Sequence, residues 1–247
     1  MEIFGYSERG IVNALFYEMG RHKEHEAILQ GFIKLAKFPF CNEGPIKGQK
    51  YIIIIEQSFS DFGDADAIVL IENNQNKKCM IFIEAKVKTS SKGKWEISRE
   101  YNKFQKGLKT KVSSSNLFTQ LYHKSRLIQA LKTKTSIESL TDKGVNFPNW
   151  STKKTRKIGN NPVVKESIKI IRPYIENVYY LAIVPGAPKD TEESIKNFKD
   201  EEQITKADKC ETTNYGYLTW EDIKNYCNDK KLEGIIKVFK YNDGQIH

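Results

Sequence analysis

The alternation of apolar and polar residues predicts two amphipathic helices at the start of the chain. Between Ser7 and Met19, apolar residues recur every three or four positions and form one stripe along a helix. Glu8 stands at the N-terminal end of that stripe, where an inward carboxylate needs a partner or a function. A second helix is predicted from Glu24 to Ala36, and Pro39 ends it because proline cannot continue a helix.

Three short apolar segments then predict β-strands. Tyr51 to Glu56 is rich in isoleucine, Asp66 to Ile71 follows a turn at residues 61–64, and Cys79 to Val87 follows a polar turn. The second and third segments are close in sequence, so we expect them to form an antiparallel hairpin.

The rest of the chain alternates between patterned and unpatterned stretches. A helix is predicted from Ser115 to Leu131, a strand from Val178 to Val184, and a short strand from Tyr215 to Leu218 that is followed by two helices. This order predicts a single α/β domain over residues 1–247. Two parts of it lie outside the expected core: residues 133–172, a basic insertion or flexible arm, and residues 187–247, a mainly helical C-terminal extension packed on the core.

Composition and charge narrow the class of protein. Of the 247 residues, 39% are hydrophobic and 29% are charged, which is typical of a folded chain. The net charge of +9 favours a polyanionic partner without establishing one. The longest apolar run, Ile52 to Ile55, is too short to span a membrane, and no signal peptide is recognisable at the N-terminus. We therefore expect a cytoplasmic protein with no membrane partner.

The segment from Ser60 to Lys88 combines apolar strands with charged residues. Side chains alternate along a strand, so Glu84 and Lys86 share one face. Two charges at the end of an apolar strand are costly unless they are paired or bind a ligand. In the predicted hairpin Asp66 lies beside them, so two carboxylates and one ammonium are expected to converge. The alternative is an ordinary exposed pair on an edge strand.

Two carboxylates suit a hard cation such as Mg²⁺, which keeps several waters and takes further oxygen ligands from a bound phosphate. Asp66 and Glu84 are the candidate ligands, and the backbone carbonyl of Ala85 is a further one. Lys86 is placed to orient or deprotonate the attacking water and to stabilise charge that develops on phosphorus.

The order of these residues resembles the PD-(D/E)XK nuclease superfamily. Ala65-Asp66 stands in place of its Pro-Asp pair, and Glu84-Ala85-Lys86 matches its (D/E)XK element. The resemblance covers roughly residues 3–185, although the motifs themselves occupy a short part of that range. The proline is missing, and Asp64 competes with Asp66 for the role of the metal-binding aspartate.

This resemblance implies a fold and an activity. The fold is a restriction-endonuclease-like core with a mixed central β-sheet flanked by helices, in the order α-β-β-β-α-β. The activity is that of a Mg²⁺-dependent deoxyribonuclease, an endonuclease that hydrolyses DNA phosphodiester bonds in restriction, defence or repair, with Mn²⁺ also supporting it. Cutting both strands of a duplex often requires a dimer in this superfamily, so a homodimer is left open.

Two further site residues come from the resemblance. The run Gly5-Tyr6-Ser7-Glu8-Arg9 is similar to the start of the first helix in Holliday junction resolvases, which implies that Glu8 helps to hold metal or water. Some members carry a glutamine on the helix after the lysine strand, and Gln120 resembles it. A first-turn glutamate favoured by the helix dipole and a surface glutamine are the plain alternatives.

The most basic part of the chain is the expected nucleic-acid surface. Between Lys124 and Arg172 there are twelve lysines and arginines against three acidic residues. Basic residues track a phosphate backbone, and aromatic residues such as Trp95, Tyr101 and Trp150 stack on bases. The residues predicted to contact DNA are Lys88, Lys124, Arg126, Lys153, Lys154, Arg156 and Lys157.

Other functions stay open at this point. RNA as the substrate and exonuclease action are not excluded. One competing reading is a nucleic-acid-binding protein with a nuclease-like fold but no catalytic activity. Another is a basic interaction protein in which the Glu-Ala-Lys triplet is accidental.

Overall fold

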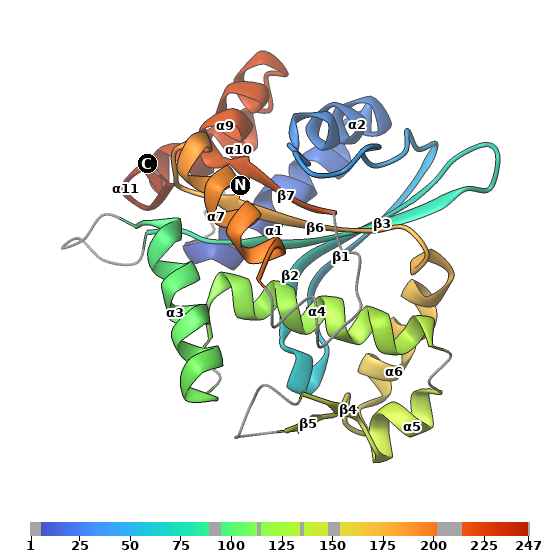
Figure 1. Ribbon diagram of the computed structural model, residues 1–247. Helices are drawn as coiled ribbons and strands as arrows, with labels where there is room; N and C mark the ends of the chain where they lie inside the picture. Colours follow the sequence, from blue (N-terminus) through green and yellow to red (C-terminus); the bar gives the residue numbers. More distant parts are fainter. Residues whose placement is uncertain are drawn as a thin grey trace.

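The computed structural model describes residues 6–88, 95–112, 115–133, 136–147, 154–201 and 214–246. Its centre is a five-stranded mixed sheet with the strand order β1-β2-β3-β6-β7 (Figure 1). The strands are β1 (Lys50–Ser58), β2 (Asp64–Glu72), β3 (Lys78–Ala85), β6 (Val178–Val184) and β7 (Tyr215–Thr219). Strand β2 is antiparallel to both of its neighbours, β1 and β3, whereas β3, β6 and β7 run parallel.

The predicted hairpin is confirmed. Strands β2 and β3 pair from Glu72 opposite Lys78 to Ala67 opposite Ile83. Strand β3 then pairs in parallel with β6, so its carboxyl end reaches the same edge of the sheet as the carboxyl ends of β6 and β7. The amino end of β2 lies at this edge too, and that geometry brings the start of one hairpin strand beside the end of the other.

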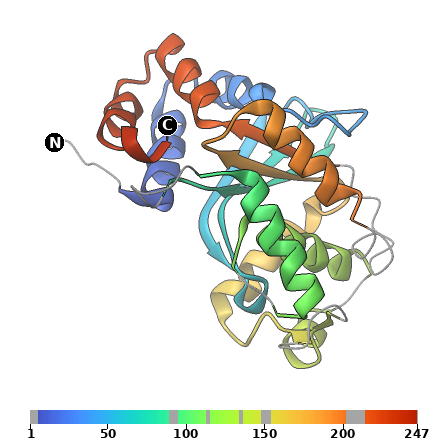
Figure 2. The ribbon, with the colours of Figure 1, turned by 60° about the vertical axis from the view of Figure 1, so that its left-hand side comes forward.

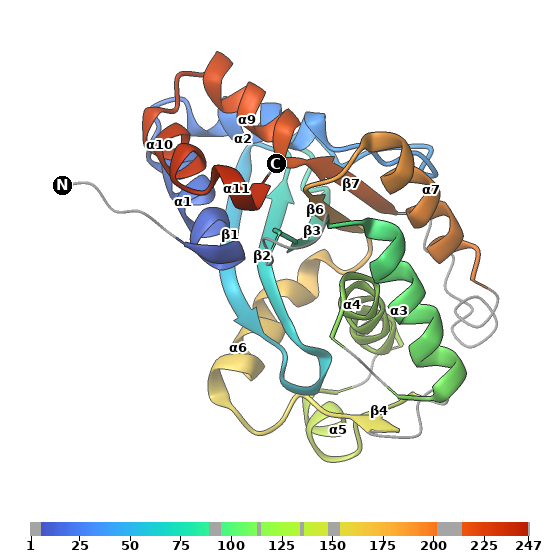
Figure 3. The ribbon, with the colours of Figure 1, turned by 90° about the vertical axis from the view of Figure 1, so that its left-hand side faces the viewer.

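Helices cover both faces of the sheet (Figure 3). One face packs against α1 (Ser7–Arg21), α2 (His25–Leu35), α9 (Trp220–Asp229), α10 (Glu233–Tyr241) and α11 (Asp243–Ile246). The other face packs against α3 (Ile97–Thr110), α4 (Leu117–Lys132), α6 (Pro162–Ile171) and α7 (Pro188–Lys199). Helix α1 contacts α10, so the two ends of the described chain meet on one face (Figure 2).

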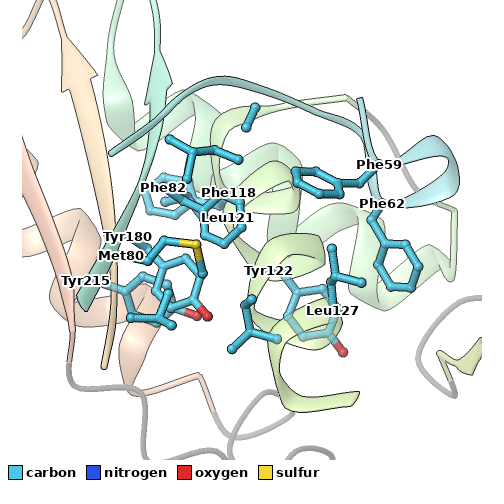
Figure 4. Packing of buried hydrophobic residues seen from close by; sticks show 14 of the residues in the cluster. Phe59, Phe62, Met80, Phe82, Phe118, Leu121, Tyr122, Leu127, Tyr180 and Tyr215 are labelled. Carbon is cyan, nitrogen blue, oxygen red and sulfur yellow. The ribbon is translucent and has the colours of Figure 1, made fainter. Parts of the chain in front are cut away.

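The period of two along the strands produces two separate cores. Ile68 and Phe82 face α4, whereas Val69 and Ile83 face α1. Stacked and edge-to-face aromatic rings fill the first core, including the parallel pair of Phe82 and Tyr180, as Figure 4 shows. Both faces of β3 are therefore buried, so a charged residue on this strand sits in an apolar surrounding.

Several segments that lack an obvious pattern are folded. Within residues 89–111, helix α3 buries Ile97, Phe104 and Leu108 at helical spacing, a signal that the abundance of lysine hides. Within residues 187–247, expected to be an extension packed on the core, α7 covers the sheet and β7 joins the sheet itself beside β6.

The described part of residues 133–172 is folded rather than a flexible arm. It forms α5 (Ile137–Asp142), the two-stranded ribbon of β4 (Val145–Asn146) and β5 (Thr155–Arg156), and α6. Short 3-10 turns, η1 (Ser60–Phe62) and η2 (Arg172–Tyr174), lie before β2 and after α6. Leu140, Phe147 and Ile168 are fully buried in the aromatic core, so this region is part of the packed domain.

No helix in these described ranges combines the length and the apolar character needed to cross a bilayer.

Candidate active site

Asp66 is held at the point where the β2–β3 ladder ends. The last backbone pair is Ala67 with Ile83, and beyond it the carboxylate of Asp66 accepts a hydrogen bond from the Ala85 N–H at 2.8 Å. The side chain thus takes the place of the next backbone acceptor, which fixes its position against the end of β3. Asp66 is 6% exposed.

Lys86 follows β3 directly and lies opposite the first helix. Its Nζ donates a hydrogen bond to Glu8 Oε1 at 2.8 Å, and both side chains are largely buried. The backbone on either side of its Cα is also held, because Lys86 N–H donates to the Ile183 carbonyl and Trp220 Nε1 donates to the Lys86 carbonyl. The predicted inward position of Glu8 is confirmed, and its direct partner is the lysine.

Glu84 is buried completely on the face of β3 that packs against α4. Its Oε1 forms an ion pair with Lys124 Nζ at 2.9 Å, and neither side chain is exposed. Lys124 Nζ also donates to the backbone carbonyl of Asp64 at 2.7 Å. The second oxygen, Oε2, has no hydrogen-bond partner among the residues described. A buried carboxylate oxygen without a partner is costly, so it is a natural acceptor or ligand atom.

Burial raises the pKa of all three carboxylates. The pKa of Glu84 rises to about 7, because complete burial outweighs the attraction of Lys124. Burial also raises the pKa of Asp66 against the opposing effects of Lys86 and the Ala85 N–H, and it raises the pKa of Glu8 against the effect of Lys86. Each group interacts electrostatically with another member of the set, so they form one coupled site.

For Lys86, the neighbouring carboxylates together affect the pKa more strongly than burial does. Burial by itself lowers the pKa of Lys86, but the nearby carboxylates Glu8, Glu84 and Asp66 together outweigh it and the net pKa is raised. The lysine is therefore protonated at neutral pH in this arrangement. It is suited to stabilise negative charge and not to take a proton from water.

The donor set fits a hard cation. In the parts of the chain that the structure describes, no group of three or more His, Cys, Asp or Glu side chains lies close enough to hold a metal ion. Mg²⁺ needs fewer protein ligands than that, since one or two carboxylates suffice when waters and phosphate complete the shell. Asp66 and Glu84 supply two carboxylates, one of which has the unpaired Oε2.

The structure places Asp64 and Asp66 in different surroundings. The carboxylate of Asp64 forms an ion pair with Arg9 at 2.9 Å, and both side chains are about half exposed. Only Asp66 is held against β3 next to Ala85. Asp66 is therefore the aspartate that the structure brings to Glu84 and Lys86.

Gln120 lies on α4 one helical turn before Lys124, so the two share a helix face. Its Oε1 is buried and has no hydrogen-bond partner among the described residues. The residue as a whole is half-buried, and its role in the site remains a prediction.

The expected DNA-contacting residues divide into buried and exposed ones. Lys124 is fully buried in the site, and Arg156 is 5% exposed, with its guanidinium donating to the Asp61 carbonyl and lying over the Phe147 ring. For these two the expected surface position is corrected. Both side chains are buried because each has a polar partner in the interior. The Lys124 ammonium pairs with the Glu84 carboxylate, and the Arg156 guanidinium donates to the Asp61 carbonyl.

The remaining candidates lie nearer the surface. Lys154 and Lys157 are exposed beside β5, and Arg126 is partly buried with its guanidinium donating to Gln129 and to the Asn146 carbonyl. Lys88 is also partly exposed. Lys153 and Trp150 lie outside the described residues.

Lys124 is the site residue whose role sequence reasoning missed. It stands in the apolar stripe of α4 formed by Leu117, Leu121 and Ile128, at a position where another apolar residue is expected. A lysine inside such a stripe signals a buried charge, and a buried charge needs an opposite partner. That signal was available, but it does not say which carboxylate is the partner.

Comparisons with protein-family models, with curated proteins and with solved structures found no match to this chain.

Proposed function

We propose that this protein is a Mg²⁺-dependent nuclease that hydrolyses phosphodiester bonds in DNA, built on a restriction-endonuclease-like core. The observation that carries the proposal is the meeting of Asp66, Glu84, Lys86 and Glu8 at one edge of the sheet. A structural ion pair needs one charge of each sign. Three largely buried carboxylates with raised pKa values, gathered around Lys86 and Lys124, are an arrangement typical of a reaction centre.

Asp66 and Glu84 would hold the cation, with the Ala85 carbonyl as a further oxygen ligand and Glu8 as an acceptor for water. When bound, the cation supplies Lewis-acid activation of the phosphate and of a water. The Ala85 N–H keeps the Asp66 carboxylate aimed at the end of β3. Lys124 supplies positive charge to the otherwise isolated Glu84 and so favours its ionised form.

Lys86 would orient the phosphate and stabilise the charge that develops on it during attack. Three hydrogen bonds fix the position of Lys86. Its side chain donates to Glu8, its backbone N–H donates to Ile183, and its carbonyl accepts from Trp220. A fixed positive charge stabilises negative charge in the transition state more strongly in a site with little water than it does in bulk water. Because Lys86 is protonated, another group would take the proton of the attacking water. Glu8 is the candidate, since its Oε1 lies beside the lysine and accepts a hydrogen bond from Lys86 Nζ.

The exposed basic residues on and after the ribbon β4–β5 would hold the nucleic acid. Lys154 and Lys157 are on the surface of this region, and Arg126 packs beneath it against Phe147. Such contacts with phosphates position a duplex without reading its sequence. Phosphate contacts of this kind form with RNA as well as with DNA, so the test includes both nucleic acids.

The test compares two pairs of substitutions on the same hairpin. Purified protein is incubated with plasmid, linear duplex, single-stranded DNA and RNA, in Mg²⁺, Mn²⁺ or EDTA. Glu84→Gln and Lys86→Met alter the site. Glu72→Gln and Lys78→Met alter the ion pair at the opposite end of β2 and β3, where the two charges are 3.6 Å apart. We expect Mg²⁺-dependent cleavage that falls by at least about 100-fold in the first pair and stays near wild type in the second.

Cleavage that persists in EDTA or in both site variants would overturn the proposal. Tight binding without cleavage of any substrate would favour a nucleic-acid-binding protein that has no catalytic activity. Absence of binding at low salt would favour a basic interaction protein.

A further inference from the structure

A cavity of about 440 Å³ opens beside the proposed reaction centre. It lies where β6 and β7 end, at the edge of the sheet that also carries Lys86, and its lining includes Val184, Thr219 and Trp220. In open α/β sheets this edge, beyond the carboxyl ends of parallel strands, is where ligands bind. The volume lies in the range of small-molecule and cofactor sites.

The cavity is joined to the reaction centre through the backbone. Trp220, which forms part of its wall, donates its indole N–H to the Lys86 carbonyl at 2.8 Å. Lys88, another lining residue, follows Lys86 by two positions, a separation of about 7 Å in extended chain. A nucleotide whose phosphate lies at Lys86 therefore has its sugar and base within reach of the cavity.

The walls of the cavity are apolar and aromatic, and its rim is polar. Ile97, Trp220 and Ile246 are buried residues of the lining, and they come from α3, α9 and α11. Trp95 is partly exposed on one side. A methyl group built on Gly186 would lie 3.5 Å from the Trp95 ring, in ordinary van der Waals contact, so the backbone at Gly186 passes close to that ring.

The charges around the cavity select the kind of ligand. Its lining contains three carboxylates, Glu96, Asp190 and Glu221, and one lysine, Lys88. An excess of negative charge disfavours a phosphate inside the cavity. Carboxylates accept hydrogen bonds from ring and amino N–H groups, and an indole face stacks on a flat ring.

We infer that this cavity receives one unpaired nucleobase of the nucleic-acid substrate, from the nucleotide next to the phosphate at Lys86. Trp95 stacks on the base, Asp190 on the rim accepts hydrogen bonds from its N–H groups, and Lys88 contacts the adjoining phosphate. Guanine suits Asp190 best, because its Watson–Crick edge presents two neighbouring N–H donors. The inference rests on the proposed function, since it names the part of the substrate that lies beside the reaction centre.

The test measures binding in EDTA, so it does not depend on cleavage. Fluorescence anisotropy follows a labelled DNA duplex with one bulged nucleotide, which is dG, dT or an abasic sugar. We expect wild-type protein to bind the dG bulge about tenfold more tightly than the abasic bulge. Trp95→Ala should abolish this preference. Asp190→Asn should keep a preference for a base over the abasic sugar but lose the preference for dG over dT.

Matched controls separate these effects from general damage. Glu193→Gln removes an exposed carboxylate from the same helix as Asp190, and Tyr17→Ala removes an exposed aromatic ring from α1. Both should bind like wild type. Asp190 is exposed, so its variant is expected to fold even if Trp95→Ala does not.

The outcomes distinguish this inference from the proposed function. Equal binding of the base and abasic bulges by wild-type protein overturns the inference even if Mg²⁺-dependent cleavage is found. A base preference that Trp95→Ala and Asp190→Asn leave unchanged also overturns it, because the base then lies elsewhere. A preference lost in these variants supports the cavity as the base site even if no substrate is cleaved.

Discussion

Lys124 on α4 places its ammonium 2.9 Å from a carboxylate oxygen of Glu84 on β3, and neither side chain is exposed to solvent. Both charges have lost their hydration, and removing water from two ions costs several kcal/mol each in a protein interior. The attraction between the two charges offsets part of this desolvation cost. In the proposed nuclease the Lys124 ammonium favours the ionised form of a ligand carboxylate, whereas burial favours the protonated form.

Replacing Lys124 with methionine should destabilise the protein in a pH-dependent way. The substitution leaves Glu84 without its counter-charge, which costs on the order of 3 kcal/mol when the carboxylate is ionised. We expect that loss in urea unfolding at pH 8 and a clearly smaller loss at pH 5.5, where Glu84 is protonated. The double variant Lys124→Met/Glu84→Gln should recover much of the stability at pH 8. Equal losses at both pH values would contradict the assignment.

The raised pKa of Glu84 predicts how stability changes with pH. Its folded-state pKa of about 7 lies above the ordinary 4.5, so between these values the folded state binds the proton more tightly than the unfolded state. The stabilisation is complete below about pH 4.5 and is lost as the pH rises through 7. Relative to Glu84→Gln, wild-type protein without metal should lose about 1–3 kcal/mol of unfolding free energy between pH 5 and 8. A flat difference curve would show that Glu84 does not titrate in this range.

Asp66 and Asp64 should behave differently when each is changed to asparagine. Asp66 is buried against Ala85 at the site, whereas Asp64 pairs with Arg9 on the surface. We expect Asp66→Asn to lower kcat/KM for DNA cleavage in Mg²⁺ by at least about 100-fold and Asp64→Asn to change it by less than about threefold. The reverse ranking would transfer the metal-binding role to Asp64.

The basic residues near the β4–β5 ribbon should separate into a structural and a binding group. Arg156→Ala removes a buried guanidinium that donates to the Asp61 carbonyl and lies over Phe147, so it should cost about 2 kcal/mol of stability. Exposed Lys154 should be dispensable for stability. Lys154→Ala should weaken DNA binding and lower the slope of log affinity against log salt by about 1 if it contacts a phosphate.

A control for this last prediction is Lys240→Ala, on α10 across the sheet, which should alter neither property. If Lys240→Ala lowers the salt slope as much as Lys154→Ala does, the attraction is a general effect of net charge and the ribbon is not the binding surface.

Two parts of the site were predictable because they depend on short-range rules. The turn between β2 and β3 is brief, and the side chains alternate, so the hairpin register alone brings Asp66 next to the end of β3 near Glu84 and Lys86. The inward position of Glu8 follows in the same way from the period of α1. Local periodicity carries this information because each neighbour is only a few residues away along the chain or across one turn.

Other features depended on contacts between distant segments. The sequence of α3 is mostly polar, and its few apolar residues are buried because they pack against α4 and α7. Strand β7 belongs to the sheet because it pairs with β6. Lys124 belongs to the site because α4 crosses the face of β3 at Glu84, forty residues earlier. By itself the sequence determined the hairpin and its charged residues. Which lysine lies buried beside them, and which cavity opens next to them, was decided by helix packing, since burial depends on the partners that the fold brings together.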